Sequence, residues 1–239
     1  MNIAFIPVRG GSKSIPLKNI KELNGKPLVY WTASAANNAR CIDKVIIATD
    51  SEEIKAVVKS FGLDKVQSYD RDKKNAEDTS STESVMLEYI QKSDLKAKDL
   101  FFLIQATSPM LKSEHIDEMY RAFMAGNADS MFSGVVEKQF HWKFLPHQIS
   151  HSQENFVVPV NYDYRNRPRR QEFEGLVAEN GACYINSVGN ILRDKCRLSG
   201  NIVAHELPAY TAYEIDEPED WLLVEELMKR YQKLCEEQK

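Results

Sequence analysis

The sequence predicts a three-layer α/β fold, in which helices cover both faces of a mostly parallel sheet. Short apolar runs of strand length alternate along the chain with amphipathic segments at helical spacing, and the connections between them are short. With 239 residues, 43% of them hydrophobic, the chain can bury a full core. We therefore expect one domain, residues 1–239, interrupted by an excursion over residues 137–178.

The first half of the chain contains the clearest elements. Three apolar runs are predicted as buried strands: 3–8 (IAFIPV), 44–50 (KVIIATD) and 100–106 (LFFLIQA). Four helix starts are predicted at Pro27, at Asp50 with Glu53, at Ser80 with Glu83, and at Ser113. Apolar residues then recur at helical spacing, and Gly62 and Gly126 are expected to end two of these helices.

The second half contains three further strand candidates, at 129–136, 181–187 and 201–207, and Pro218 is predicted to begin a terminal helix. Residues 137–178 break the alternation, because they are rich in aromatic residues and arginines and carry no long amphipathic pattern. We interpret this segment as an excursion from the sheet that covers a site or contacts a second subunit.

Composition excludes several classes of function. The net charge of −4 argues against general binding to nucleic acids or anionic membranes, and no apolar run is long enough to span a membrane. The opening MNIAFIPV is interpreted as a first strand and not as a signal peptide. The four cysteines show no metal-ligand spacing, which is typical of reduced thiols in a cytoplasmic protein.

The loop after the first strand, Arg9 to Asn19, has the composition of a polyphosphate site. Its two glycines, Gly10 and Gly11, let backbone N–H groups approach an anion, and Arg9, Lys13 and Lys18 bring positive charge. It matches neither the Walker spacing nor G-x-G-x-x-G. A solvated turn explains the same composition.

Polar residues follow other strands too, where ligands bind in open parallel sheets. Residues 78–82 (DTSST) could donate to a nucleobase or ribose, or could simply cap a helix. Gln105 ends a buried strand and needs a polar partner, which could be a ligand or a backbone group.

Residues 214–220 (EIDEPED) form an acidic segment. If residues 214–216 are extended, Glu214 and Asp216 lie on one face and could bind Mg²⁺ together with substrate phosphates. Glu217, Glu219 and Asp220 are better explained as helix N-terminal charge. The arginines between 165 and 170 favour a carboxylate or phosphate clamp over a nucleic acid duplex, because Glu172 and Glu174 follow them.

Several of these segments, in their order along the chain, resemble the acylneuraminate cytidylyltransferases, also called CMP-sialic acid synthetases. They are IPVRGGSKSIPLKNIKELNGKPL (6–28), ATDSEEI (48–54), DTSST (78–82), IQATSP (104–109), RPRRQ (167–171), ENGACYI (179–185) and EIDEPED (214–220). The resemblance implies a Rossmann-like fold with a dimerisation excursion. It also implies a cytoplasmic transferase that couples CTP to a nine-carbon 2-keto sugar acid with Mg²⁺, giving a CMP-sugar and pyrophosphate.

The resemblance also implies roles for individual residues. The catalytic groups would be Arg9, Lys13, Lys18 and Asp216. The CTP contacts would be Arg9, Gly10, Gly11, Ser12, Lys13, Asn19, Arg71, Ser81 and Thr82. The sugar contacts would be Gln105, Lys143, Arg170 and Gln171, with Arg170 reaching in from the partner subunit of a homodimer. Asp216 and Glu214 would bind the metal, although the family usually has Asp-x-Asp where this chain has Glu214-Ile215-Asp216.

Three other hypotheses stay open on the sequence. The nearest is a cytidylyltransferase for 3-deoxy-manno-octulosonate, the eight-carbon acid. A CTP-binding regulatory module without catalysis would keep the Gly10-Gly11 loop. A protein that binds nucleic acid through residues 165–170 ranks last.

Overall fold

The computed structural model describes residues 1–77, 80–145 and 155–237, and side chains up to residue 231. Within these residues the core is a seven-stranded sheet of order β11-β7-β10-β6-β1-β4-β5. Its strands are β1 (Asn2–Pro7), β4 (Lys44–Thr49), β5 (Val66–Asp70), β6 (Leu100–Ile104), β7 (Ser130–Glu137), β10 (Leu176–Ser187) and β11 (Ile202–Glu206). Four neighbouring pairs are parallel, and β10 runs antiparallel to both β6 and β7.

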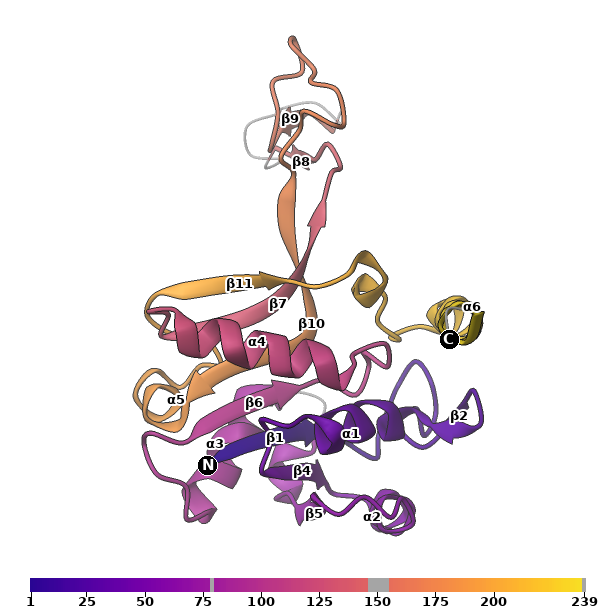
Figure 1. Cartoon of the computed structure of the whole chain (residues 1–239), viewed down its shortest axis with the longest axis vertical. Coiled ribbons are helices and arrows are strands. Elements are labelled where there is room, and N and C mark those ends of the chain that lie inside the picture. The colour runs from indigo at the N-terminus through magenta and orange to yellow at the C-terminus, as the bar shows by residue number, and fades with distance from the viewer. Residues whose placement is uncertain (78–79, 146–154, 238–239) are drawn as a thin grey trace.

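Helices pack on both faces of this sheet, which confirms the three-layer α/β fold (Figure 1). One face is covered by α1 (Leu28–Asn38), α2 (Glu52–Lys59) and α4 (Ser113–Ala125). The other face is covered by α3 (Thr82–Lys92) and α5 (Val188–Asp194). The central strands β1, β4 and β6 are nearly free of solvent exposure, because a parallel sheet covered on both sides must be apolar throughout.

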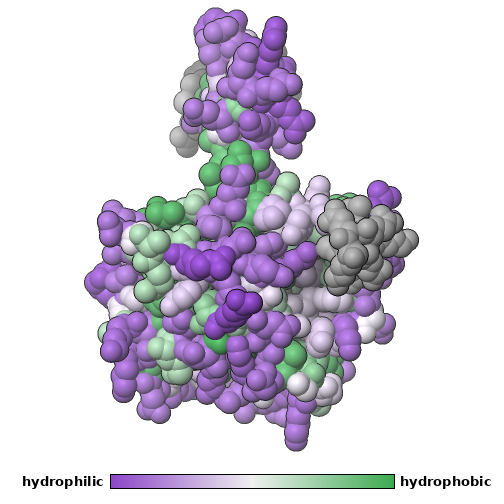
Figure 2. Space-filling view, in the orientation of Figure 1, coloured by the Kyte–Doolittle hydropathy of each residue, from purple (hydrophilic) through white to green (hydrophobic). Residues whose placement is uncertain are grey.

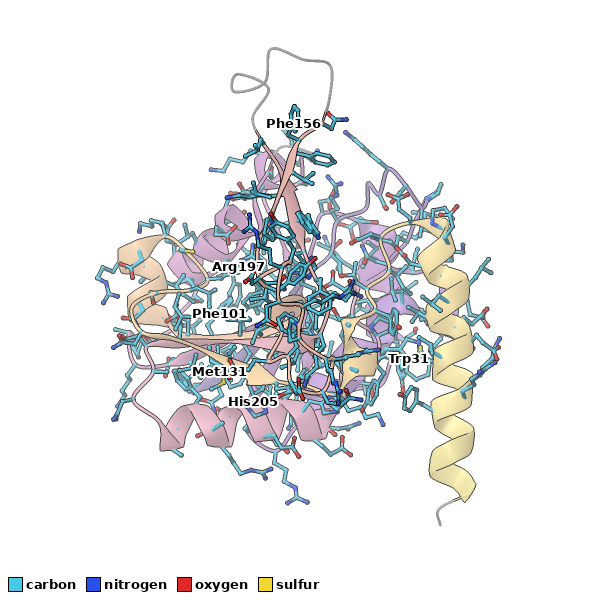
Figure 3. All side chains as sticks on the ribbon, turned by 90° about the horizontal axis from the view of Figure 1, so that it is seen from above. Trp31, Phe101, Met131, Phe156, Arg197 and His205 are labelled. Carbon is cyan, nitrogen blue, oxygen red and sulfur yellow. The ribbon has the colours of Figure 1, made fainter. Side chains whose placement is uncertain are left out.

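A third apolar cluster attaches the end of the chain to its beginning. The short strands β2 (Glu22–Leu23) and β3 (Lys26–Pro27) pair beside α6 (Pro218–Glu237). Trp221 and Val224 of α6 pack with Leu23 and Leu28, and the Asn24 amide donates to the Glu225 carbonyl at 3.1 Å. Figures 1 and 3 show α6 along one side of the body. None of the helices in the described part of the chain is long and apolar enough to cross a membrane.

The excursion predicted at 137–178 forms an arm that projects away from the body (Figure 1). β7 runs out to Glu137 and β10 returns from Leu176, so the two strands are antiparallel and form the base of the arm. The outer part contains β8 (Trp142–Phe144) paired with β9 (Val157–Pro159). Figure 2 shows hydrophobic surface at the neck, where the described side chains of Leu176 and Val177 are exposed.

Three helix starts differ from the prediction. Ser51, not Asp50, caps α2, and its Oγ accepts from the Ile54 N–H at 3.3 Å. Ser81, not Ser80, caps α3, and Lys112 precedes α4, whose first residue is Ser113. Both serine caps have extended backbone, which lets the hydroxyl reach the amide three residues on. Asp50 accepts from the Gly10 N–H instead.

Candidate active site

A pocket of about 570 Å³ lies beyond the carboxyl ends of β1 and β6, where ligands bind in open parallel sheets. It is lined by segments that are far apart in the sequence: the loop after β1, the loop after β5, the start of α3, the loop after β6 and the segment before α6. Ten residues named from the sequence line it: Arg9, Ser12, Lys13, Lys18, Asn19, Arg71, Ser81, Thr82, Gln105 and Asp216. Gly10 and Gly11 belong to the same first loop.

The first loop is held against the sheet by its own polar groups. The Asn19 side-chain amide donates to the Arg9 carbonyl at 3.1 Å, and the Gly10 N–H donates to Asp50 Oδ1 at 3.1 Å. Leu17 has a φ of +51°, a left-handed conformation that costs a non-glycine residue about 1–2 kcal/mol. The loop is therefore fixed in a shape that its local sequence does not favour.

The acidic segment is attached directly to this loop. Ser14 Oγ donates to the Asp216 carbonyl at 2.5 Å. Lys18 Nζ donates to the Ile215 carbonyl at 2.9 Å and to Asp216 Oδ1 at 3.1 Å. The Asp220 carboxylate, in the first turn of α6, accepts from the N–H groups of Asp216 and Glu217 and so fixes the backbone just before the helix. These contacts bring Asp216 to the wall that also carries Arg9.

Glu214 lies next to Asp216 but does not line the pocket. Its Oε1 approaches Gly181, and a Cβ added to that glycine would collide with this oxygen and lie 3.1 Å from Gln105 Nε2. Burial, and then the Asp216 charge, raises the pKa of Glu214 to about 7. A carboxyl in this position would be ionised by a cation bound next to it.

Neighbouring side chains support the segment that carries Glu214. Asn180 is buried and donates from Nδ2 to the Thr211 carbonyl at 3.2 Å and to Thr211 Oγ1 at 3.0 Å. Its Oδ1 accepts from Ser133 Oγ at 2.6 Å, which joins β7 to the irregular part of β10. Arg197, labelled in Figure 3, pairs with Glu83 of α3 at 2.6 Å and lies 5.1 Å over the Tyr184 ring of β10.

Arg71 presents an under-satisfied cation to the pocket. Its side chain is largely buried, one guanidinium nitrogen donates to the Asn75 carbonyl, and Nε has no hydrogen-bond partner among the described residues. Burial lowers the pKa of Arg71, whereas the charges of Asp50 and Glu88 act in the opposite direction. A buried N–H without a partner is costly, and a ligand oxygen would relieve that cost.

Four further pocket residues were given no individual contact role from the sequence. Ser14, Ser80, Thr107 and Glu217 line the pocket. Thr107 Oγ1 is buried without a hydrogen-bond partner in the described structure. Thr107 immediately follows the predicted strand end, so its place after a buried strand was the available signal. Asp78 and Thr79 of the DTSST segment lie outside the described residues.

The sugar-contact candidates other than Gln105 lie elsewhere. Lys143, Arg170 and Gln171 are exposed on the arm. Arg170 lines a separate arm pocket of about 480 Å³, together with Lys138, Arg167 and Phe140. The structure therefore does not bring these three residues to the pocket of their own chain, and the expectation that residues 137–178 cover it stays a prediction about a second chain.

The donor set at the acidic segment suits a hard cation only in part. No group of three or more His, Cys, Asp or Glu side chains in the described residues could hold a metal ion. Asp216 and the adjacent Glu214 supply oxygen donors, and Mg²⁺ commonly combines one or two carboxylates with substrate phosphates. The residues present therefore fit Mg²⁺ if a polyphosphate completes its coordination.

A family model described as "Cytidylyltransferase" matches residues 3–159, well over half of the chain. The chain belongs to the cytidylyltransferase family. It is 35% identical to the N-acylneuraminate cytidylyltransferase of Oncorhynchus mykiss over 95% of this chain and 50% of that protein. It is 28% identical to the enzyme of the same name from Streptococcus agalactiae, over 93% of this chain and 52% of that protein. The chain thus spans about half the length of the curated relatives it matches.

Solved structures agree on the cytidylyltransferase fold. A CMP:2-keto-3-deoxy-manno-octonic acid synthetase complexed with CTP has a TM-score of 0.68 at 17% identity, covering 96% of this chain and 99% of that chain. A Francisella tularensis 2-C-methyl-D-erythritol 4-phosphate cytidylyltransferase has a TM-score of 0.63 at 14% identity, covering 93% and 97%. At these identities the likeness concerns the fold alone.

The close approach at Gly181 leads to a prediction for this cytidylyltransferase. Gly181 has a φ of +63°, and a Cβ there would collide with Glu214 Oε1. We expect Gly181→Ala to lower the free energy of unfolding by about 1–3 kcal/mol, from backbone strain and from displacement of Glu214. Urea denaturation measures it. Gly11→Ala is the control, because nothing lies within 4 Å of a Cβ there. A Gly181→Ala variant as stable as the wild type would contradict this geometry.

A buried carboxylate holds the loop that carries Arg71. Glu88 accepts from the Tyr69 hydroxyl at 2.8 Å, the Asp72 N–H at 2.9 Å and the Asn75 amide at 2.5 Å. Burial acts to raise the pKa of Glu88, but these hydrogen bonds, together with one from Lys92, outweigh it and lower the pKa below its usual 4.5. The ionised form of Glu88 therefore stabilises the fold.

This carboxylate makes stability depend on pH. Because the pKa of Glu88 is lower in the folded state, its contribution is fully present above pH 4.5 and is lost as the pH falls through the folded-state pKa. We expect Glu88→Gln to be less stable than the wild type at neutral pH by about 1–3 kcal/mol. The difference should shrink as the pH falls below 4.5. Chemical denaturation at a series of pH values measures it, and a difference independent of pH would contradict this role.

Proposed function

We propose that this chain catalyses the coupling of CTP to the anomeric hydroxyl of a nine-carbon 2-keto sugar acid, giving a CMP-sugar and pyrophosphate. N-acetylneuraminate and its deaminated form belong to this substrate class. One observation carries the proposal: Arg9, Lys13 and Lys18 from the head of the chain and Asp216 from near its tail line one pocket. The curated relatives named N-acylneuraminate cytidylyltransferase support the choice of sugar acid.

The pocket residues divide into groups by chemistry. Arg9, Lys13 and Lys18 supply positive charge for the triphosphate, together with the N–H groups near Gly10 and Gly11. This charge offsets the repulsion between a triphosphate and an anionic sugar, and it stabilises the charge that develops on the departing pyrophosphate.

The base and ribose are assigned to a second group of residues that line the pocket. Arg71 brings the buried N–H that lacks a partner among the described residues. Ser81 and Thr82 lie at the start of α3, and Asn19 anchors the first loop from below. Because Ser81 Oγ already accepts the Ser84 N–H at 3.1 Å, its hydroxyl hydrogen stays available for a ligand acceptor.

We assign Mg²⁺ to Asp216, with Glu214 beside it. Bound there, Mg²⁺ would supply positive charge to the phosphate oxygens. The half-buried Glu214 and Gln105 both approach Gly181, so the acidic segment lies near the residue that we assign to the sugar. Gln105 is the sugar contact that belongs to the same chain.

The remaining sugar contacts are assigned to a second copy of the chain in a homodimer. Lys143, Arg170 and Gln171 are exposed on an arm that points away from its own body (Figure 1). The arm also exposes apolar side chains, including Phe144 and Val160, which are 70% and 52% accessible. Basic and apolar groups on one projecting arm suit contact with a partner subunit and an anionic substrate.

The free thiols of Cys41, Cys183 and Cys196 suit a reducing, cytoplasmic compartment.

Pyrophosphate release by the purified protein tests this function. We expect release only when CTP, Mg²⁺ and a nine-carbon 2-keto acid are all present. The panel of acids should include N-acetylneuraminate, deaminated neuraminate and the eight-carbon 3-deoxy-manno-octulosonate. Preference for the eight-carbon acid would correct the substrate class. CTP binding without turnover on any acid would instead indicate a regulatory module.

A further inference from the structure

Lys18 has a second relationship that the phosphate role does not explain. Its Nζ lies 3.1 Å from Asp216 Oδ1 and is fixed by the Ile215 carbonyl at 2.9 Å. The Lys18 side chain is only 12% accessible, whereas the Asp216 side chain is 65% accessible. The ammonium is therefore held in place against the carboxylate, unlike the mobile partners of ordinary surface ion pairs.

This arrangement opposes binding of a divalent cation to Asp216. A metal ion at Oδ1 would have to displace the ammonium or share the oxygen with it, and two cations at one carboxylate repel each other. The Asp220 carboxylate is partly occupied, because its Oδ2 already accepts from two backbone N–H groups.

The charge of the pocket acts in the same direction. Four cationic side chains, Arg9, Lys13, Lys18 and Arg71, line it among the described residues, against the two carboxylates of Asp216 and Glu217. Without a nucleotide, this excess of basic over acidic lining side chains favours polyanions over metal cations. A triphosphate reverses that balance, and Lys18 belongs to the same loop that we assign to the phosphates.

We propose that Lys18 is a resident counter-ion of Asp216, which it releases when nucleotide phosphates draw its ammonium away. Metal binding at Asp216 is then coupled to nucleotide binding: the free protein binds the metal weakly, and the nucleotide complex binds it well. The part of this inference that involves the nucleotide rests on the proposed function. The part that concerns the protein without nucleotide depends only on the Lys18–Asp216 contact.

The test measures Mn²⁺ binding to the whole chain without nucleotide. The electron paramagnetic resonance signal of free Mn²⁺ reports how much of the ion stays unbound. Lys18→Met should bind one Mn²⁺ about tenfold more tightly than the wild type, within the usual range of coupling between sites. Combining Lys18→Met with Asp216→Asn should abolish the gain, which would locate the ion. Lys18→Gln serves as a second neutral variant if thermal melting shows that the methionine variant is unstable.

Three controls separate competition at Asp216 from simpler effects. Lys21→Met removes the same charge from a lysine whose Nζ lies 4.4 Å over the Trp221 ring, so it should leave Mn²⁺ affinity unchanged. Ser14→Ala breaks another contact between the loop and Asp216 without changing charge, and should also have no effect. Lys18→Arg keeps the positive charge, so its binding of Mn²⁺ should stay as weak as that of the wild type.

Two results would overturn the counter-ion role. The first is Mn²⁺ affinity in both neutral Lys18 variants that is no higher than in the wild type. The second is an equal increase in Mn²⁺ affinity in Lys21→Met, which would show that the effect comes only from the change in net charge. CTP affinity, measured with and without Mn²⁺, tests the same coupling from the other ligand. Mn²⁺ should increase the affinity for CTP more in the wild type than in Lys18→Met. A wild type that binds no CTP would instead refute the proposed function and leave the Mn²⁺ comparison standing.

Discussion

Asp216→Asn is expected to lower turnover by about a thousandfold while the chain stays folded. The substitution keeps the shape of the side chain but removes the charge that we assign to the metal, and a bound metal contributes several kcal/mol to charge stabilisation. The Asp216 side chain is 65% accessible, and Lys18 Nζ keeps the Ile215 carbonyl as an acceptor, so we expect the variant to stay folded. Pyrophosphate release measures turnover, and thermal unfolding measures stability.

Glu217→Gln is the matched control for this variant. Glu217 is the next residue, it is exposed, and it lines the same pocket. It should keep turnover close to the wild-type value, because its charge is assigned to the start of α6. Near-normal Mg²⁺-dependent turnover in Asp216→Asn would show that the metal is held elsewhere.

Mixing two defective variants is expected to restore activity. Asp216→Asn damages the pocket of its own chain, and Arg170→Ala damages the arm that we assign to the partner's pocket. A heterodimer of the two has one pocket with both parts intact. Random reassociation makes half of the dimers mixed, so we expect about a quarter of wild-type activity at a sugar concentration too low for Arg170→Ala alone.

Arg169→Ala is the control for the arm. It removes a neighbouring exposed arginine that does not line the arm pocket with Arg170. This variant should keep its own activity at the same low sugar concentration. If the mixture of Asp216→Asn and Arg170→Ala is no more active than its two components, the arm does not complete a partner's pocket.

The sequence predicted the strands and helices where burial leaves a strong pattern. β1, β4 and β6 are almost wholly buried, so they appear as apolar runs. β5 was not predicted, because it lies at the edge of the sheet and contains only half-buried and exposed residues. β10 runs antiparallel to its neighbours because the chain returns from the arm along β7. The amino-acid composition of β10 does not indicate this direction.

The sequence predicted which loops form the site. It did not predict the buried side chains that hold those loops in place. Parallel strands bring the loop after β1 and the loop after β6 to one edge, so Arg9 and Gln105 could be placed together from the sequence. The contacts of Glu88 with Asn75 and of Asn180 with Thr211 depend on tertiary packing, and neither residue stood out. The helix caps were displaced by one residue, because Asp50 and Ser80 are used by other backbone groups.

The structure of the chain crystallised with CTP and Mn²⁺ tests the central claim most directly. The anomalous signal of Mn²⁺ would locate the ion independently of the nucleotide density. We expect the triphosphate between the Arg9–Asn19 loop and Asp216, the ion on the Asp216 carboxylate, and the base toward Arg71 and Thr82. A nucleotide on another surface, or an ion bound away from Asp216, would contradict the convergence of head and tail on one triphosphate.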